Sequence, residues 1–322
     1  MKLHNNKQDF TELIQLTANH FAILPEFIEK DYWITLVLHN LSLSSHANSV
    51  VFKGGTSLTK GYRLINRFSE DIDIALLDEK LTGNQLKTKI RKIEKTITVD
   101  LKEIEEQGLT RKGSVYRKSL FQYSSNIDSR LASNVQKRII LEINSFANPY
   151  PFEKHEVTSF ITDFLTATNQ TEAIKGYGLQ AFALNILDKR RTMLEKLTSL
   201  IRFSFSENPS KELANKIRHF YDLYHLAKDK ECAEYLQSAK FQRDLHEIVN
   251  HDKQEFDEPR GWQSKSIKDS PLATNFSSLW VSLRSIYENE LRPLAFSKIP
   301  DEKLIEKTFI EIAKNNLKEN GC

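Results

Sequence analysis

Cysteine is almost absent from this 322-residue sequence, which has only Cys232 and Cys322. Two cysteines cannot build a disulfide framework, so a reducing, cytoplasmic location is the simplest expectation. The N-terminal residues contain no apolar signal core, and no run of about 18 apolar residues exists, so we expect no signal peptide and no membrane span. Internal repeats and low-complexity tracts are missing as well.

The sequence also lacks a strong excess of one charge. Lys and Arg number 46 against 43 Asp and Glu, a net charge of +3. This balance neither establishes nor excludes a nucleic-acid partner. Hydrophobic residues make up 39% and charged residues 28%, which is typical of a globular protein. The length suits one large domain or two ordinary ones.

One stretch combines several chemically distinctive residues. Val51-Phe-Lys-Gly-Gly-Thr-Ser-Leu-Thr-Lys60 is followed by Arg67-Phe-Ser-Glu-Asp-Ile-Asp-Ile74. A short β-branched run over 49–53 predicts a strand, and two glycines after it predict a turn. The spacing predicts a helix over 56–65, then a strand over 71–77 whose residues alternate in period two.

The remaining pattern predicts an α+β protein. Two further strands are expected over 115–123 and 136–145, and helices over 9–20, 25–42 and 79–107. Beyond about residue 185 the pattern is helical, including segments 186–204 and 209–228. From these elements we expect a small mixed sheet in residues 1–165 and a mainly helical region in residues 166–322.

Asp71 and Asp73 are one residue apart on the expected strand, so their side chains point to the same face. Two such carboxylates repel each other unless a cation lies between them. Mg²⁺ prefers hard oxygen ligands and is often held by one or two carboxylates together with substrate phosphates. The alternative is an exposed pair on an edge strand, which is less favoured because Asp is depleted in strands.

The glycine turn offers a complementary phosphate site. Gly54 and Gly55 allow backbone N–H groups to approach a ligand closely, and Thr56 and Ser57 add hydroxyl groups at the helix start. A tight structural turn is an equally good explanation of these residues alone. The stretch is not a Walker A motif, because Lys60 is not at the required offset.

Three other groups of charged residues have both a structural and a functional explanation. Glu142 stands alone among Ile139, Ile140, Leu141 and Ile143; it joins the aspartates if its strand lies beside theirs, and otherwise meets solvent. Glu29, Lys30 and Asp31 interrupt an apolar helix; they form a solvated face, or Lys30 or Asp31 reaches the site. The basic residues of segment 79–107 form a solvated face or a phosphate-backbone contact; they are Lys87, Lys89, Arg91, Lys92 and Lys95.

The order of these motifs resembles the nucleotidyltransferase superfamily that includes polymerase beta. The amino-acid sequence of segments 52–60 and 67–74 more closely resembles that of the AbiEii-type nucleotidyltransferase toxins, which include the mycobacterial MenT enzymes. Those proteins belong to type IV toxin–antitoxin and phage abortive-infection systems. The resemblance covers about residues 25–228 and is most specific across 52–74.

Two later segments resemble the family's third and fourth motifs. In Arg191-Thr-Met-Leu-Glu-Lys-Leu197 the motif lysine is Lys196, and in Arg218-His-Phe-Tyr-Asp-Leu-Tyr224 the motif aspartate is Asp222. Lys196 lies within the apolar stripe of its helix, so it either snorkels or pairs with an anion. Asp222 is expected opposite the core face, beside Arg218, where an ordinary i,i+4 pair is the alternative.

The resemblance implies a metal-dependent enzyme that transfers a nucleoside monophosphate from an NTP and releases pyrophosphate. Asp71 and Asp73 would hold Mg²⁺ or Mn²⁺, and Glu142 would complete a second metal position or deprotonate the attacking hydroxyl. The implied nucleotide-binding residues are Gly54, Gly55, Thr56, Ser57 and Lys60. Lys196 would neutralise the triphosphate and Asp222 would orient Lys196 or a substrate hydroxyl, in a cleft between the two domains.

The resemblance also implies partners. Some family members add nucleotides to the 3′ end of tRNA, which blocks translation, and a separate antitoxin protein neutralises them. Two other hypotheses share the same motifs: an enzyme that modifies a small molecule such as an antibiotic, and a non-catalytic nucleotide-binding or interaction module.

Overall fold

The computed structural model describes residues 1–69, 71–77, 81, 83–125, 127 and 135–317. The chain packs as two compact units, each described separately below. The first contains residues 1–62 and 68–187, and the second contains residues 63–67 and the chain from 188 onward. In chain order the main division falls after Leu187, so residues 166–187 pack with the first unit.

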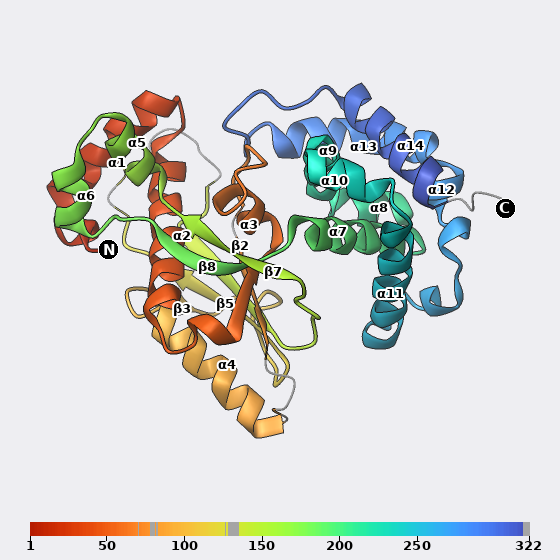
Figure 1. Ribbon diagram of the computed structural model, residues 1–322, viewed down its shortest axis with the longest axis horizontal. Coiled ribbons are helices and arrows are strands. Elements are labelled where there is room, and N and C mark those ends of the chain that lie inside the picture. Colours follow the sequence, from red (N-terminus) through yellow and green to blue (C-terminus); the bar gives the residue numbers. More distant parts are fainter. Residues whose placement is uncertain (70, 78–80, 82, 126, 128–134, 318–322) are drawn as a thin grey trace. The chain divides into compact units, whose positions relative to one another are not determined.

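The described strands of the first unit form one mixed sheet in the order β3-β5-β6-β2-β1-β8-β7, with β4 paired to β5. The strands are β1 (Val50–Lys53), β2 (Asp71–Leu76), β3 (Lys102–Ile104), β4 (Arg111–Lys112), β5 (Tyr116–Gln122), β6 (Arg138–Asn144), β7 (Phe152–Val157) and β8 (Phe182–Leu187). β1 pairs with β8, and β2 with β6, in parallel, while the other pairs are antiparallel. The sheet and its many helices confirm the α+β class (Figure 1).

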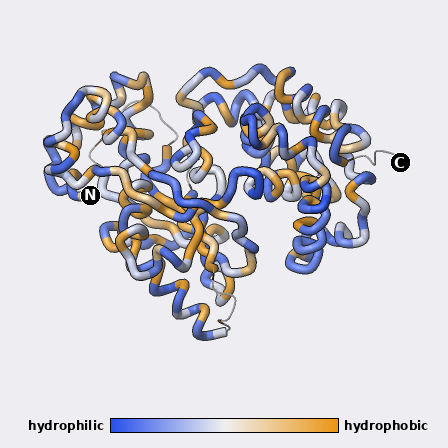
Figure 2. Tube along the Cα trace, viewed as in Figure 1, coloured by the Kyte–Doolittle hydropathy of each residue, from blue (hydrophilic) through white to orange (hydrophobic). Residues whose placement is uncertain are grey.

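The first unit also contains α-helices and short 3-10 helices. They are η1 (Leu3–Asn5), α1 (Lys7–Phe21), α2 (Pro25–Leu43), η2 (Ala47–Ser49), α3 (Gly54–Lys60), α4 (Gly83–Ile97), α5 (Phe160–Ala167) and α6 (Thr171–Tyr177). α2 begins at Pro25, whose fixed φ and missing N–H suit a first helical position. α2 packs against β6, β8 and α4, and α4 also packs against β6. The strands of the sheet contain many hydrophobic residues, as Figure 2 shows.

Hydrogen bonds assign the two faces of the sheet. Arg117 and Ser119 on β5 both donate to the buried Glu94 carboxylate of α4, at 2.5 and 2.7 Å. Lys118, between them in sequence, binds Glu142 on β6 instead. Because successive side chains on a strand point to opposite faces, α4 covers one face and Glu142 lies on the other.

Several expected elements have different bounds in the structure. The helix expected over 56–65 is α3, which begins at Gly54 and ends at Lys60. The helix expected over 79–107 ends at Ile97, and β3 occupies 102–104; residues 78–80 and 82 lie outside the described residues. The solvated-face interpretation of Glu29, Lys30 and Asp31 is wrong, because all three are at most 4% exposed.

The second unit is mainly helical in its described residues. The helices are α7 (Lys189–Ser204), α8 (Pro209–Ala214), α9 (Ile217–Lys228), α10 (Lys230–Leu236), α11 (Ala239–Glu255), η3 (Trp262–Ser264), η4 (Ile267–Asp269), α12 (Pro271–Thr274), α13 (Phe276–Leu291) and α14 (Glu302–Asn316). The helix expected over 209–228 is therefore interrupted between α8 and α9. Phe220 packs its ring against Phe276, Trp280 and Phe309, which joins α9, α13 and α14 in one core. Among the described helices, none has the length and apolar character needed to span a bilayer.

Candidate active site

The carboxylates of Asp71 and Asp73 lie on one face of β2, in the middle of the sheet of the first unit. Both residues are half-buried. The parallel register pairs Asp73 directly with Glu142 on β6, so Glu142 points to the same face. The condition for Glu142 to join the aspartates, that its strand lies beside theirs, is therefore met in the sheet.

Gly54 brings the glycine turn against this carboxylate pair. It has a φ of +77°, a left-handed conformation that side chains rarely adopt. A Cβ atom at Gly54 would lie 2.0 Å from Asp73 Oδ2, which no real side chain tolerates. Only glycine allows the backbone to approach the carboxylate this closely. The turn and the carboxylates therefore form one continuous feature.

The hydroxyl groups of the turn hold its own backbone together. Thr56 Oγ1 donates to the carbonyl of Asp71 at 2.5 Å, and Ser57 Oγ donates to the carbonyl of Gly54 at 2.8 Å. Both residues are at most 3% exposed. In this structure they fasten the turn to β2, and their direct contact with a nucleotide stays a prediction.

Lys60, at the end of α3, lies in a buried ion pair. Its Nζ is 2.5 Å from Asp31 Oδ1 and donates to the carbonyl of Thr158 at 2.9 Å. The other Asp31 oxygen accepts from the backbone N–H of Phe160 at 2.9 Å. The pair ties α2, α3 and the start of α5 together beside the turn. Nucleotide binding by Lys60 stays a prediction. Asp31 would hold the Lys60 ammonium in place.

Glu142 is bound by two neighbours on β5. Lys118 Nζ lies 2.7 Å from Oε1, and Tyr116 donates its hydroxyl to Oε2 at 2.8 Å. Burial alone would lower the pKa of Lys118, but the hydrogen bond and charge of Glu142 outweigh it and raise the pKa, so the ammonium stays charged. Burial and Glu142 also raise the pKa of Tyr116, which keeps its proton on the hydroxyl.

The donor set suits a hard divalent cation at Asp71 and Asp73. Two same-face carboxylates beside a glycine turn match the preference of Mg²⁺ and Mn²⁺ for oxygen ligands shared with substrate phosphates. Within the described ranges, no three Asp, Glu, His or Cys side chains are arranged to share one ion. Glu142 as a further metal ligand therefore stays a prediction.

Asp222 lies at the centre of a buried cluster in the second unit. Its Oδ1 accepts from Arg67 Nε at 2.8 Å, and its Oδ2 accepts from Arg67 Nη2 and Lys196 Nζ, each at 2.7 Å. Asp222 is 0% exposed. Burial raises the pKa of this carboxyl, but the two cations outweigh burial and hold the pKa well below its usual range. Besides Lys196, the cation that binds Asp222 is Arg67, and not the expected neighbour Arg218. The prediction that Asp222 lies opposite the core face is wrong, because the residue is fully buried.

Three residues near these groups were missed from the sequence. Arg67 opens the second half of the distinctive stretch, but nothing in a linear pattern links it to a residue 155 positions later. Lys118 and Tyr116 could have been found from period-two alternation on the strand over 115–123. That alternation places them on one face, but only the pairing of β5 with β6 puts them against Glu142.

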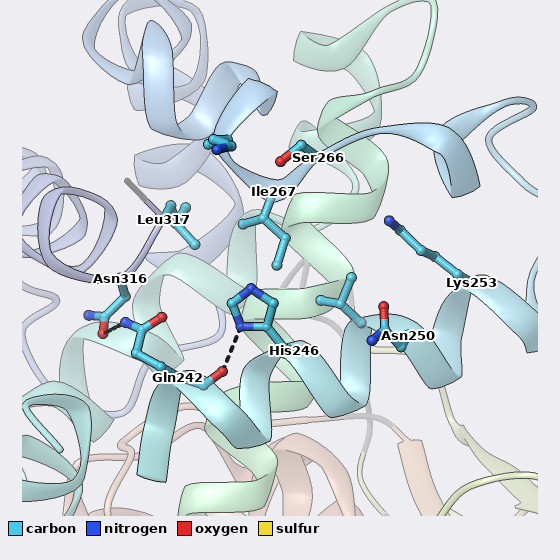
Figure 3. A pocket seen from close by; sticks show the side chains of 10 residues that line it. Gln242, His246, Asn250, Lys253, Ser266, Ile267, Asn316 and Leu317 are labelled. Carbon is cyan, nitrogen blue, oxygen red and sulfur yellow. Dashed lines mark hydrogen bonds between the residues drawn. The ribbon is translucent and has the colours of Figure 1, made fainter. Parts of the chain in front are cut away.

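A separate polar cavity of about 180 Å³ lies within the second unit. α11 contributes Gln242, His246 and Asn250, and the end of α14 contributes Asn316 (Figure 3). His246 bonds through Nδ1 to the carbonyl of Gln242 at 2.8 Å, and Gln242 donates to Asn316 Oδ1 at 2.8 Å. Some of the lining polar groups thus bond to one another, and the cavity has room for ordered water.

Comparison with known proteins agrees with this geometry. The family model described as "Nucleotidyl transferase AbiEii toxin, Type IV TA system" matches residues 36–302. The solved structure of MenT4, a nucleotidyltransferase toxin from Mycobacterium tuberculosis H37Rv, is similar with a TM-score of 0.58. That match is 19% identical and covers 94% of this chain and 89% of that one, so it supports the fold. No curated protein matches the sequence.

A glycine turn held against paired carboxylates, on a mixed sheet with this family match, defines a nucleotidyltransferase. The chain belongs to the AbiEii family of nucleotidyltransferase toxins of type IV toxin–antitoxin systems. The hypothesis of a non-catalytic module is thereby set aside.

Proposed function

We propose that this toxin transfers a nucleoside monophosphate from an NTP to the 3′ end of tRNA, with Mg²⁺ or Mn²⁺ as cofactor. Pyrophosphate is released, and the capped tRNA no longer supports translation in the cytoplasm. A cognate antitoxin counteracts the effect. The observation that carries the proposal is the contact between the turn and the carboxylates, where a Cβ at Gly54 would lie 2.0 Å from Asp73 Oδ2.

This contact supports nucleotide binding for a physical reason. Triphosphate oxygens need backbone N–H donors and a counter-cation at the same place, and the turn and β2 supply both within one short segment. Asp71 and Asp73 would hold the cation, whose chemistry when bound is to offset the charge on the phosphates. The backbone N–H groups of Gly54 and Gly55 would bind the phosphates beside it.

The other candidate residues have supporting roles in the proposal. Thr56 and Ser57 keep the turn in shape through their bonds to the backbone. Lys60 and Asp31 anchor α3, and Glu142 shapes the charge of the carboxylate face. Lys196 and Asp222 remain candidate catalytic residues of the second unit, where Asp222 orients the ammonium of Lys196.

The proposal is tested with the full-length chain, each NTP labelled at the α-phosphate, and total tRNA. We expect label on tRNA and an added nucleotide at its 3′ end on sequencing. Asp71→Asn and Asp73→Asn should abolish labelling, because each removes a charged oxygen ligand. Glu172→Gln is the matched control, since this acid on α6 is 90% exposed.

Two outcomes separate the alternatives. Labelled product of low molecular weight, with no label on RNA, would indicate a small-molecule acceptor. Labelling that persists in Asp71→Asn and Asp73→Asn would contradict the assignment of the site itself.

A further inference from the structure

A row of charged residues crosses the sheet of the first unit, with a lysine at each end. Strand register pairs Lys53 on β1 with Asp73 on β2, and Asp73 with Glu142 on β6. Glu142 is paired in turn with Lys118 on β5. Residues paired directly across neighbouring strands point to the same face, and Asp71 shares that face with Asp73. Lys118 therefore lies on the face of the proposed metal and phosphate site.

Glu142 fixes the position of the Lys118 ammonium. Lys118 Nζ lies 2.7 Å from Glu142 Oε1, while the Tyr116 hydroxyl donates to Oε2 at 2.8 Å. An ammonium has three N–H groups. Within the described part of the chain, this one has Glu142 as its single hydrogen-bonding partner. The Lys118 side chain is 23% exposed, so its remaining N–H groups are open to a ligand.

The charge of Lys118 acts on all three carboxylates of this face. Burial lowers the pKa of Lys118, but the hydrogen bond and charge of Glu142, together with the charges of Asp71 and Asp73, outweigh burial and raise the pKa. The ammonium therefore stays charged at neutral pH, within electrostatic reach of both aspartates. A triphosphate beside Asp71 and Asp73 brings further negative charge to this face, and a divalent ion offsets only part of it.

We infer that the Lys118 ammonium binds a phosphate oxygen of the nucleotide, through an N–H group that Glu142 leaves open. The inference rests on the proposed function in placing the triphosphate beside Asp71 and Asp73. Lysine binds phosphate as a compact charge with rotatable donors, so one N–H group stays on Glu142 while another meets the ligand. Glu142 is then the residue that positions Lys118. The alternative is a cross-strand ion pair that only joins β5 to β6.

The experiment measures binding of each NTP, and of inorganic tripolyphosphate, to the full chain in the presence of Mg²⁺ by titration calorimetry. Tripolyphosphate has no base or sugar, so it reports on phosphate contacts alone. Lys118→Met should raise both dissociation constants by about tenfold or more, because a charge-assisted hydrogen bond is lost. Lys118→Arg keeps the charge and should stay within about threefold of wild type. Lys175→Met is the matched control, since this lysine on α6 is 62% exposed.

Glu142→Gln separates the inference from the alternative. Gln keeps an acceptor oxygen for Lys118 and removes one negative charge from the face. Tripolyphosphate should therefore bind Glu142→Gln as tightly as wild type, or more tightly. If the two residues form only a cross-strand pair, Lys118→Met and Glu142→Gln should change binding to the same extent.

Four results would overturn the inference. They are absence of tripolyphosphate binding in the wild type, equal binding by wild type and Lys118→Met, an equal loss in Lys118→Met and Glu142→Gln, and a loss in Lys118→Met that is confined to tRNA binding. If circular dichroism shows that Lys118→Met does not fold, Lys118→Gln replaces it, because Gln is neutral and can still donate to Glu142. Failure of the proposed function would appear differently, as NTP binding that depends on Lys118 without transfer of label.

Discussion

Replacing Asp222 by Asn leaves the Arg67 guanidinium and the Lys196 ammonium together in a buried site without a counter-charge. The wild-type cluster has one carboxylate for two cations, and all three side chains are at most 8% exposed. Asn keeps the shape of the side chain but removes the charge and one acceptor. Breaking a buried pair in this way costs about 3–5 kcal/mol of unfolding free energy. For a domain of this size that corresponds to a fall in Tm of roughly 10 °C.

Denaturant unfolding of the second unit measures this loss. Trp262 and Trp280 are 1% exposed and lie in the second unit, so a Trp33→Phe background confines the fluorescence signal to that unit. Glu288→Gln is the matched control, because its pair with Arg292 is exposed and is worth about 0.5 kcal/mol or less.

The pH dependence of the unfolding free energy provides a second measurement on the same cluster. The pKa of Asp222 is lower in the folded state than in the unfolded chain. Its contribution to stability is therefore present above the unfolded pKa of about 4 and is lost as the pH falls through the folded pKa. The difference in unfolding free energy between wild type and Asp222→Asn should become smaller below about pH 4. At pH 7, disruption of a buried charge cluster predicts a loss of several kcal/mol of unfolding free energy. An Asp222→Asn variant whose unfolding free energy lies within about 1 kcal/mol of wild type would refute the reasoning.

Three further predictions follow from the same structure. Gly54→Ala should lower NMP transfer by roughly 100-fold, because its Cβ displaces the Asp73 carboxylate; unchanged transfer would show that their close approach is unnecessary. Burial lowers the pKa of His219 well below its usual value. The unfolding free energy of the wild type should therefore fall as the pH drops below about 6.5, by at most about 1.4 kcal/mol per pH unit. Measured by unfolding at several pH values, His219→Gln should lack this component. The groups that act on this imidazole are Lys196, Lys216, Asp222 and Arg67. α4 covers the face of the sheet opposite Glu142, so neutralising the exposed cations of α4 should leave NMP transfer near the wild-type rate. A loss of transfer, together with a weaker dependence of transfer on salt, would instead indicate phosphate contacts. The triple variant is Lys87→Gln, Arg91→Gln, Lys95→Gln.

The helices and strands with strong periodicity could be predicted from the sequence, while charged residues inside them could not be placed. Glu29, Lys30 and Asp31 have the composition of a solvated face, yet they are buried because distant groups satisfy them. Lys30 donates to the carbonyl of Gln136 at 3.1 Å, and Asp31 binds Lys60 at 2.5 Å. Partners this far apart in the chain leave no local signal, so burial of a charge depends on tertiary contacts.

The sequence by itself determined which residues make up the proposed site of the first unit. A glycine turn and an acid-x-acid strand predict a phosphate site and a cation site, because turn conformation and period-two alternation are local properties. Only the tertiary structure decided which groups compensate the remaining charges. Strand pairing set Lys118 against Glu142, and the packing of residues 63–67 set Arg67 against Asp222, because both contacts join segments whose separation no short-range pattern encodes.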